Sequence, residues 1–176
     1  LDYLQEAERL YRRSPIPNVR PIGALKVRFW LRQGRLAEAL DWVKGCGMSV
    51  NDQSSYLREY EHLTLANVLI AQYGCDGKEE VICQVVDLLT RLLNAAEEKI
   101  RTGSIIQILV ALALARAAQT KLSVAITSLE QALILAEPEG YVRIFVDPGT
   151  PIVPLLHEAM KRNIAPTYTH RLLPSP

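Results

Sequence analysis

The stretch Gly103–Gly140, GSIIQILVALALARAAQTKLSVAITSLEQALILAEPEG, decides the fold of this chain. Between Ile105 and Ala118 only Gln107 and Arg116 are polar, so a helix here is apolar on nearly every side and must be buried by several neighbours. After a polar break, apolar residues recur at spacings of three and four, which is typical of an amphipathic helix. Two helices joined by so short a turn are expected to pack antiparallel.

The ends and the contact face of this hairpin also follow from the residue types. Ser104 and Gln107 fit a capping box at the start of the first helix. Proline and glycine in the EPEG segment, Glu137–Gly140, are expected to end the second helix. Small and large apolar residues alternate on the face that the second helix should bury, and these are Leu122, Ala125, Ile126, Leu129, Ala132, Leu133 and Ala136.

The same pattern of paired helices extends over the rest of the chain. Periodicity and Gly/Pro punctuation predict further helices at about residues 1–11, 21–33, 36–44, 55–73, 80–98, 152–162 and 167–173. Asp52 or Ser54 is a suitable cap for the helix that begins at Ser55. The segment YVRIFVD, Tyr141–Asp147, alternates like a strand, but a lone strand has no partner, so a short helix or an extended turn is expected.

The returning helices of successive hairpins align at an irregular spacing that is longer than the ideal tetratricopeptide (TPR) period. We therefore predict an all-α fold, a TPR-like α–α superhelix of degenerate antiparallel helix hairpins. It should form a single domain over residues 1–173, with residues 174–176 beginning a linker. Stacked hairpins leave a concave surface lined mainly by the first helix of each pair.

Composition excludes several classes of protein. The net charge is +1, with 20 Lys and Arg against 19 Asp and Glu along the chain, which argues against a nucleic-acid footprint. The longest apolar segment would rise only about 21 Å as a helix, too short for a bilayer of about 30 Å. No leader peptide is indicated, and the odd, dispersed cysteines suit a reducing compartment, so a cytoplasmic location is expected.

The sequence also lacks any pattern that indicates chemistry. There is no phosphate-binding G-x-x-x-x-G-K-[ST] loop, no G-x-S-x-G elbow and no paired cysteines for zinc. His157 and His170 have no acid or nucleophile at a triad-like spacing. We therefore expect no catalytic, metal-binding or cofactor-binding residues, and no enzyme activity.

Four stretches together resemble one family. They are YLREYEHLTLANVLIAQ at Tyr56–Gln72, RTGSIIQILVALALA at Arg101–Ala115, ALILAEPEGYVRIFVDPG at Ala132–Gly149 and IAPTYTHRLL at Ile164–Leu173. Over nearly the whole chain the sequence resembles the helical-repeat (TPR-like) region of the large MalT-like, ATP-dependent LuxR-family transcriptional regulators of bacteria.

The resemblance implies a modular regulator with a nucleotide-binding switch domain, a winged helix, a helical-repeat region and a LuxR-type helix-turn-helix. By this resemblance the chain would correspond to the last part of the repeat region, and residues 174–176 would lead to the DNA-binding module. The resemblance also implies a role in transcription regulation and signal sensing. We expect no direct binding of nucleic acid and no membrane association by this fragment.

In such a family the repeat region senses an inducer or a regulatory protein, so polar residues on groove-lining helices are candidates. Tyr56, Arg58, Glu59 and His62 cluster near the start of one such helix. The structural alternative is a solvated helix face with a capping network.

Three further candidates are Gln107, Arg116 and Arg143. Gln107 and Arg116 interrupt an apolar helix, so each should meet a buried partner or reach the concave surface. Arg143 is placed to form an internal ion pair with Asp147 that ties the last repeat to the C-terminal segment. A purely architectural role is the alternative for all three.

Two functions remain open. The first is an effector-sensing domain that binds an unknown small-molecule inducer in its concave groove and relays that state to the nucleotide-binding and DNA-binding modules. The second is a TPR scaffold that binds a regulatory protein or peptide, or associates with itself, without a small-molecule ligand. An exposed apolar strip would favour a protein partner, and a pocket with convergent polar groups would favour a metabolite.

Overall fold

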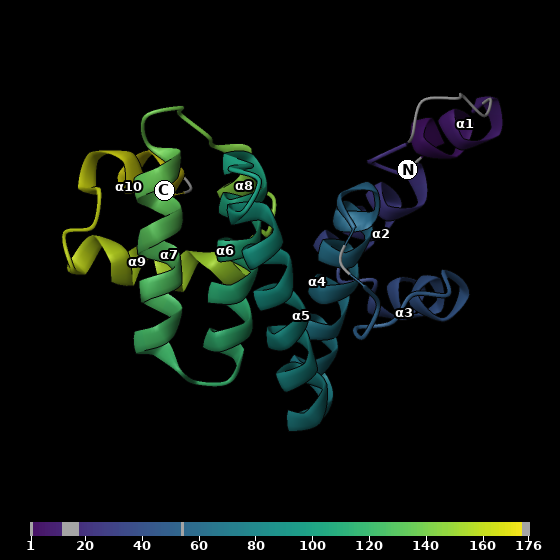
Figure 1. Ribbon diagram of the computed structural model, residues 1–176, viewed down its shortest axis with the longest axis horizontal. Helices are drawn as coiled ribbons and strands as arrows, with labels where there is room; N and C mark the ends of the chain where they lie inside the picture. The colour runs from purple at the N-terminus through teal and green to yellow at the C-terminus, as the bar shows by residue number, and fades with distance from the viewer. Residues whose placement is uncertain (1, 12–17, 54, 174–176) are drawn as a thin grey trace. The chain divides into compact units, whose positions relative to one another are not determined.

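A computed structural model describes residues 2–11, 18–53 and 55–173, and every regular element among these residues is helical (Figure 1). The elements are α1 (Asp2–Leu10), α2 (Ile22–Arg32), α3 (Leu36–Gly45), η1 (Tyr56–Arg58), α4 (Glu59–Asp76), α5 (Glu79–Glu97), α6 (Thr102–Ala118), α7 (Leu122–Ala136), α8 (Arg143–Val146), η2 (Thr150–Ile152), α9 (Val153–Lys161) and α10 (Pro166–Leu172). The predicted all-α class is confirmed. None of the described helices has the length and apolar character needed to cross a bilayer.

The chain divides into two compact units, residues 1–84 and 85–176, and the boundary falls inside α5. The single repeat domain over residues 1–173 stays a prediction. The linker expected at residues 174–176 lies outside the described residues.

In unit 1, residues 1–84, the helices α2, α3 and α4 pack on one another. Val27, Ala39 and Val68, one from each helix, are fully buried together. Larger side chains pack around them: Trp30, Leu31, Leu36, Leu40, Trp42 and Val43. The small residues at the centre let the helices approach closely, as in other helix bundles.

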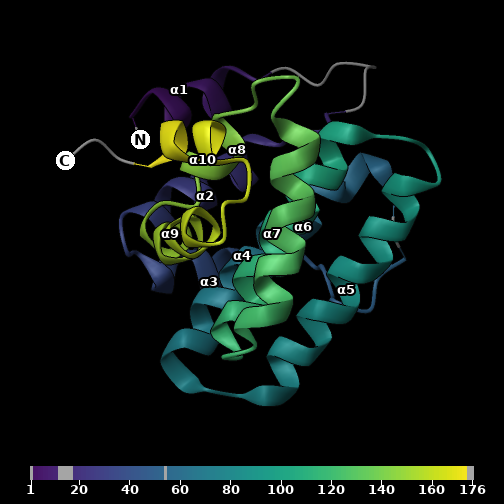
Figure 2. The same ribbon diagram turned by 90° about the vertical axis from the view of Figure 1, so that its left-hand side faces the viewer.

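In unit 2, residues 85–176, α6 and α7 form the predicted antiparallel hairpin (Figure 2). Ile106 and every residue from Ile108 to Ala115 are buried, which confirms that α6 is covered on several faces. The predicted contact face of α7 is buried except for Leu122, which is 45% exposed. Leu122 is the first residue of α7 and directly follows the turn after α6, which ends at Ala118.

The C-terminal helices close the core of unit 2. The segment Tyr141–Asp147 contains the short helix α8, Arg143–Val146, which agrees with the expectation of a short helix or turn and not a strand. Phe145 from α8 is fully buried and meets the ring of Tyr168 from α10 edge-on, with ring centroids 6.0 Å apart. The Tyr168 hydroxyl donates a hydrogen bond to the backbone carbonyl of Tyr141. Burial raises the pKa of Tyr168 to about 12. This contact holds α10 against the end of the α6–α7 hairpin.

Five helices end in the same way, with one residue in the left-handed conformation. The backbone N–H of the next residue then bonds to a carbonyl five positions earlier, which is the long bond of a Schellman motif. The left-handed residues are Gly34, Ile100, Thr120, Gly140 and Asn163. The predicted capping box at Ser104 is wrong, because α6 begins at Thr102 and Ser104 lies inside its first turn.

Ile100 is the least suited of these residues to its backbone conformation, since its φ is 53° and its side chain is β-branched and 84% exposed. We expect Ile100→Gly to raise the free energy of unfolding by about 1 kcal/mol, because glycine adopts this region without steric cost. The urea unfolding midpoint measures the change. Ile100→Ala is the control, since it removes the exposed side chain but keeps the Cβ. An equal gain in both variants would rule out backbone strain as the cause.

Candidate effector site at the start of α4

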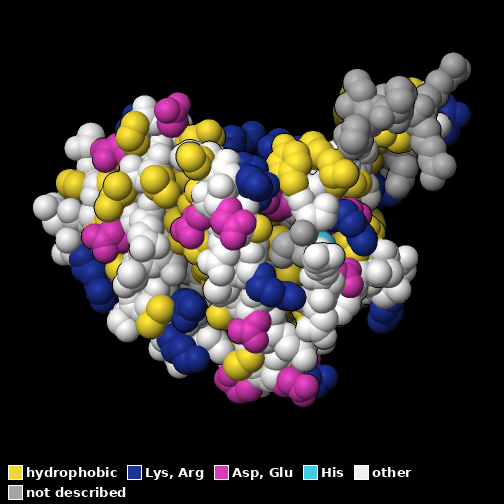
Figure 3. Space-filling model, viewed as in Figure 1, with side chains coloured by type: hydrophobic (Ala, Val, Ile, Leu, Met, Phe, Trp, Pro, Cys, Tyr) yellow, Lys and Arg dark blue, Asp and Glu magenta, His cyan; other side chains and the backbone are white. Residues whose placement is uncertain are grey.

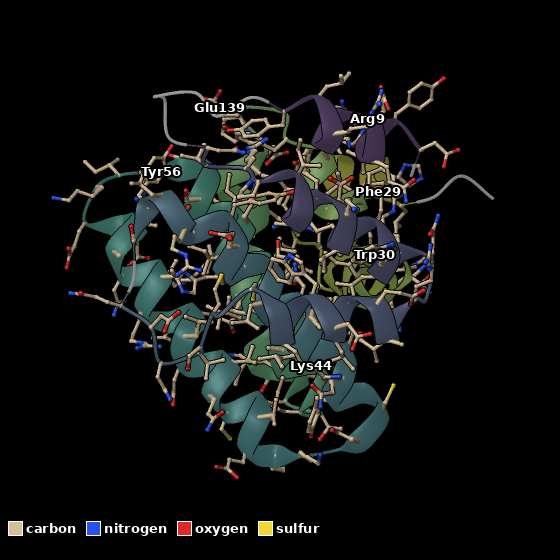
Figure 4. The ribbon with its side chains drawn as sticks, turned by 90° about the vertical axis from the view of Figure 1, so that its right-hand side faces the viewer. Arg9, Phe29, Trp30, Lys44, Tyr56 and Glu139 are labelled. Carbon is tan, nitrogen blue, oxygen red and sulfur yellow. The ribbon has the colours of Figure 1, made fainter. Side chains whose placement is uncertain are left out.

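The four candidates from the first half of the chain lie together in unit 1, as their spacing predicts. Tyr56 and Arg58 belong to η1, and Glu59 and His62 lie in the first turn of α4. Residues three and four apart share a helix face, which brings Arg58, Glu59 and His62 side by side. Glu59 and His62 are buried, whereas Tyr56, which is labelled in Figure 4, is 55% exposed.

His62 is the chemically unusual member of the cluster. It is only 1% exposed, yet neither ring nitrogen has a hydrogen-bond partner among the described residues. The nearest acid is Asp52, whose Oδ2 lies 3.8 Å from Nε2. Burial lowers the pKa of His62, and the charge of Arg58 lowers it further, while the charge of Asp52 and the nearby backbone carbonyl of Arg58 oppose the shift. The ring is therefore neutral at pH 7 and offers one donor and one acceptor.

Charged groups surround this neutral ring. Arg58 Nε lies 3.2 Å from Glu61 Oε2 and forms an ion pair that is partly exposed. Asp52 accepts a hydrogen bond from the backbone N–H of Ser49 at 3.0 Å, which closes the turn before α4. Asp52 does not act as the predicted helix cap, because the N-cap residue is Arg58 and the carboxylate is used in the turn. The alternative cap, Ser54, lies outside the described residues.

The contribution of α2 and of the segment before it is not apparent from the sequence. The guanidinium carbons of Arg28 and Arg20 lie 4.0 and 5.7 Å from the centroid of the Tyr60 ring, within cation–π range. Arg28 Nε also donates to Thr64 Oγ1 at 3.3 Å. Two arginines thus reach α4 beside the candidate cluster. The sequence feature that could have indicated these contacts is the stretch between Glu8 and Glu38, which contains Lys and Arg residues but no Asp or Glu.

The other three candidates belong to unit 2. Gln107 and Arg116 are half-buried on α6, and the Nε of Arg116 is buried without a hydrogen-bond partner in the described part of the chain. Arg143 Nε does pair with Asp147 Oδ1 at 3.1 Å. Both side chains are exposed and the pair stays within one helical turn, so it does not tie α8 to the C-terminal segment. Phe145 and Tyr168 make that connection instead.

The arrangement at α4 is suited to binding and not to covalent chemistry. It offers a neutral imidazole, guanidinium groups, carboxylates and aromatic rings. In the described residues no group of three or more His, Cys, Asp and Glu side chains is placed to hold a metal ion.

Comparison with protein families matches residues 1–162 to the MalT-like TPR region. The chain belongs to this family. Membership confirms the resemblance seen in the sequence and the TPR-like nature of the helix hairpins, and it indicates a regulatory helical-repeat region. No curated protein and no solved structure matches the chain.

The buried histidine of this MalT-like TPR region should make its stability depend on pH. Because the pKa of His62 is lowered in the folded state, the unfolded state takes up a proton first, near pH 6.5. Stability should be fully present above about pH 6.5 and fall as the pH drops toward the folded-state pKa. Urea unfolding across this range measures the effect. His62→Gln should flatten the profile, whereas His157→Gln, at an exposed position of α9, should leave it unchanged. An identical profile for His62→Gln would contradict the assignment.

Proposed function

We propose that this MalT-like TPR region binds an effector at the start of α4 and relays its presence to the nucleotide-binding and DNA-binding modules of a LuxR-type regulator in the bacterial cytoplasm. The observation that supports it is His62, a buried ring whose two nitrogens lack hydrogen-bond partners, beside Asp52 and Arg58. Buried polar groups are normally paired, and an unpaired group costs about 1–3 kcal/mol. The domain itself has no catalytic role and uses no cofactor.

An effector that completes these hydrogen bonds would stabilise one arrangement of the repeats over another. Neutral imidazole, a guanidinium group and a carboxylate together can bind the hydroxyl groups of a small polar metabolite such as a sugar. Access requires a local opening of unit 1, because His62 is covered in this structure. The difference in affinity between the covered and open states then drives the switch.

Calorimetric titration with a panel of sugars and polar metabolites tests the proposal. The informative variant is Arg58→Gln, and Arg162→Gln is a matched control. Both arginines bond to a glutamate through Nε, at 3.2 and 2.9 Å, and their side chains are 42% and 44% exposed. Heat of binding that is lost in Arg58→Gln and kept in Arg162→Gln is the expected result. No heat from the panel, or equal heat from both variants, would count against a small-molecule effector at this site.

A second function is favoured by one observation. Tyr56 and Leu57 are neighbours in η1 and are 55% and 49% exposed, so an apolar patch adjoins the polar cluster. Such a patch suits a regulatory protein or a second copy of the chain. Sedimentation velocity over a range of concentrations tests self-association. A dimer that Leu57→Asp removes, and that Ile134→Asp at an exposed site of α7 does not, would support the scaffold function.

A further inference from the structure

Positive charge is concentrated in one part of the sequence and is not spread evenly. Between Glu8 and Glu38 there is no Asp or Glu. The same stretch holds eight of the chain's 20 Lys and Arg residues: Arg9, Arg12, Arg13, Arg20, Lys26, Arg28, Arg32 and Arg35. A net charge of +1 for the whole chain conceals this segregation. The α2 helix and its flanks are therefore a cationic element in a protein whose remaining residues are net acidic.

Aromatic side chains lie among these cations. Lys26 Nζ and the guanidinium carbon of Arg35 lie 5.7 and 5.9 Å from the centroid of the Trp30 ring. Phe29, next to it in the helix, is 46% exposed. Figure 4 shows Phe29 and Trp30 on α2, with Arg9 on the neighbouring α1. Tyr56 of the candidate effector site lies away from them in that view.

The outward side of α2 has an apolar centre and cationic edges. Ala24 and Val27 point into the core, and the opposite side carries Ile22, Leu25, Lys26, Phe29, Arg32 and Gln33. Phe29, Arg32 and Gln33 are exposed on this side, whereas Ile22, Leu25 and Lys26 are half-buried, and α1 also packs on α2. Ile22, Leu25 and Phe29 follow the i, i+3, i+7 spacing with which one helix meets another. Lys26 and Arg32 flank them. We name this side of α2, together with Trp30 and Arg35, the α2 face.

We infer that the α2 face binds an acidic amphipathic helix of a partner protein. Apolar side chains of such a helix would cover Phe29 and its neighbours, and its carboxylates would meet the surrounding cations. Arg35 already lies 2.7 Å from Glu38, but a guanidinium group has five N–H donors and can bind a second carboxylate. The inference does not depend on the proposed effector site, because Arg20 and Arg28 serve Tyr60 and are not used here.

A single-stranded nucleic acid is the competing anionic partner, and the geometry of Trp30 disfavours it. Sequence-tolerant binding of single strands relies on bases stacking on aromatic rings. Two cations already lie within cation–π range of the Trp30 ring, so a stacking base would have to displace one of them. A carboxylate can instead bind a cation that remains over the ring.

Fluorescence anisotropy with a defined probe tests the inference. The probe is a synthetic labelled helical peptide with Leu at i, i+3 and i+7 and Asp or Glu on both flanks. The control peptide has Asn and Gln in place of the acids. The full chain should bind the acidic probe, and Lys26→Glu combined with Arg32→Glu should weaken binding by about tenfold or more. Lys44→Glu combined with Lys161→Glu, at cations 76% and 77% exposed on α3 and α9, should change it by less than about twofold.

Further measurements separate the possible outcomes. In a Trp42→Phe background, binding should alter the fluorescence of Trp30, the remaining tryptophan. Circular dichroism shows whether the charge-reversed variant remains folded. If it does not, Phe29→Ser is a second variant that should weaken binding without altering charge. No binding of the acidic probe, equal binding of the neutral control peptide, or tighter binding of a single-stranded oligonucleotide would overturn the inference.

Discussion

Phe145→Ala is expected to lower the free energy of unfolding by about 3–5 kcal/mol, the largest effect of any substitution considered for this protein. Phe145 is 0% exposed and belongs to the same core cluster as the α6–α7 hairpin. Its ring also meets Tyr168 edge-on, and such pairs add about 0.5–1.5 kcal/mol beyond the burial of apolar area. Truncation leaves a cavity where α8, α10 and the hairpin meet. The chemical denaturation midpoint measures the loss.

Val146→Ala is the matched control for this substitution. Val146 follows Phe145 in α8 but is 41% exposed, so its truncation should stay within about 0.5 kcal/mol. Tyr168→Phe separates the two contributions, since it keeps the ring pair and removes the hydrogen bond to the Tyr141 carbonyl, at a cost of about 1 kcal/mol. A small effect of Phe145→Ala would show that the C-terminal helices are not held by this contact.

Ala125→Leu is expected to destabilise the protein by about 1–3 kcal/mol through overpacking. Ala125 is 0% exposed on the face of α7 that packs in the core with α6, where a small residue allows close approach of the helices. The three heavy atoms that leucine adds beyond Cβ cannot be accommodated there without shifting a helix or forcing a poor rotamer. Thermal or urea unfolding measures the change.

The control for this second prediction lies on the opposite side of the same helix. Thr127 is exposed, so Thr127→Leu should alter stability by no more than about 0.5 kcal/mol. An unchanged midpoint for Ala125→Leu, or an equal change in both variants, would mean that the contact face of α7 has been placed wrongly.

Much of the fold was predictable because its signals are local. Helical periodicity and Gly/Pro punctuation located the helices to within a few residues, and the apolar run in α6 correctly indicated burial on several faces. Helix ends were harder to predict. The left-handed conformation of Gly140 is the one expected of a glycine at a helix end. Ile100 and Thr120 adopt the same conformation although their β-branched side chains do not normally favour it.

The candidate site was only partly predictable, for a related reason. Residues 56–62 were grouped correctly because they share one helix face. The contact of Arg28 with Thr64 joins residues 36 positions apart, and no short-range pattern indicates it. The ion pair of Arg143 with Asp147 forms as predicted, because the two residues are four positions apart. Its expected role in tying the last repeat to the C-terminal segment was wrong, because the pair is local and exposed.

The sequence by itself determined the helix hairpins, the buried character of α6 and the MalT-like TPR family, because each depends on residue types at short, regular spacings. Only the tertiary structure decided that His62 is buried without a hydrogen-bond partner, that Arg20 and Arg28 reach Tyr60, and that Phe145 and Tyr168 hold the C-terminal helices. These features arise from packing between segments far apart in the chain. Burial and pairing of a side chain depend on what the other segments bring to it.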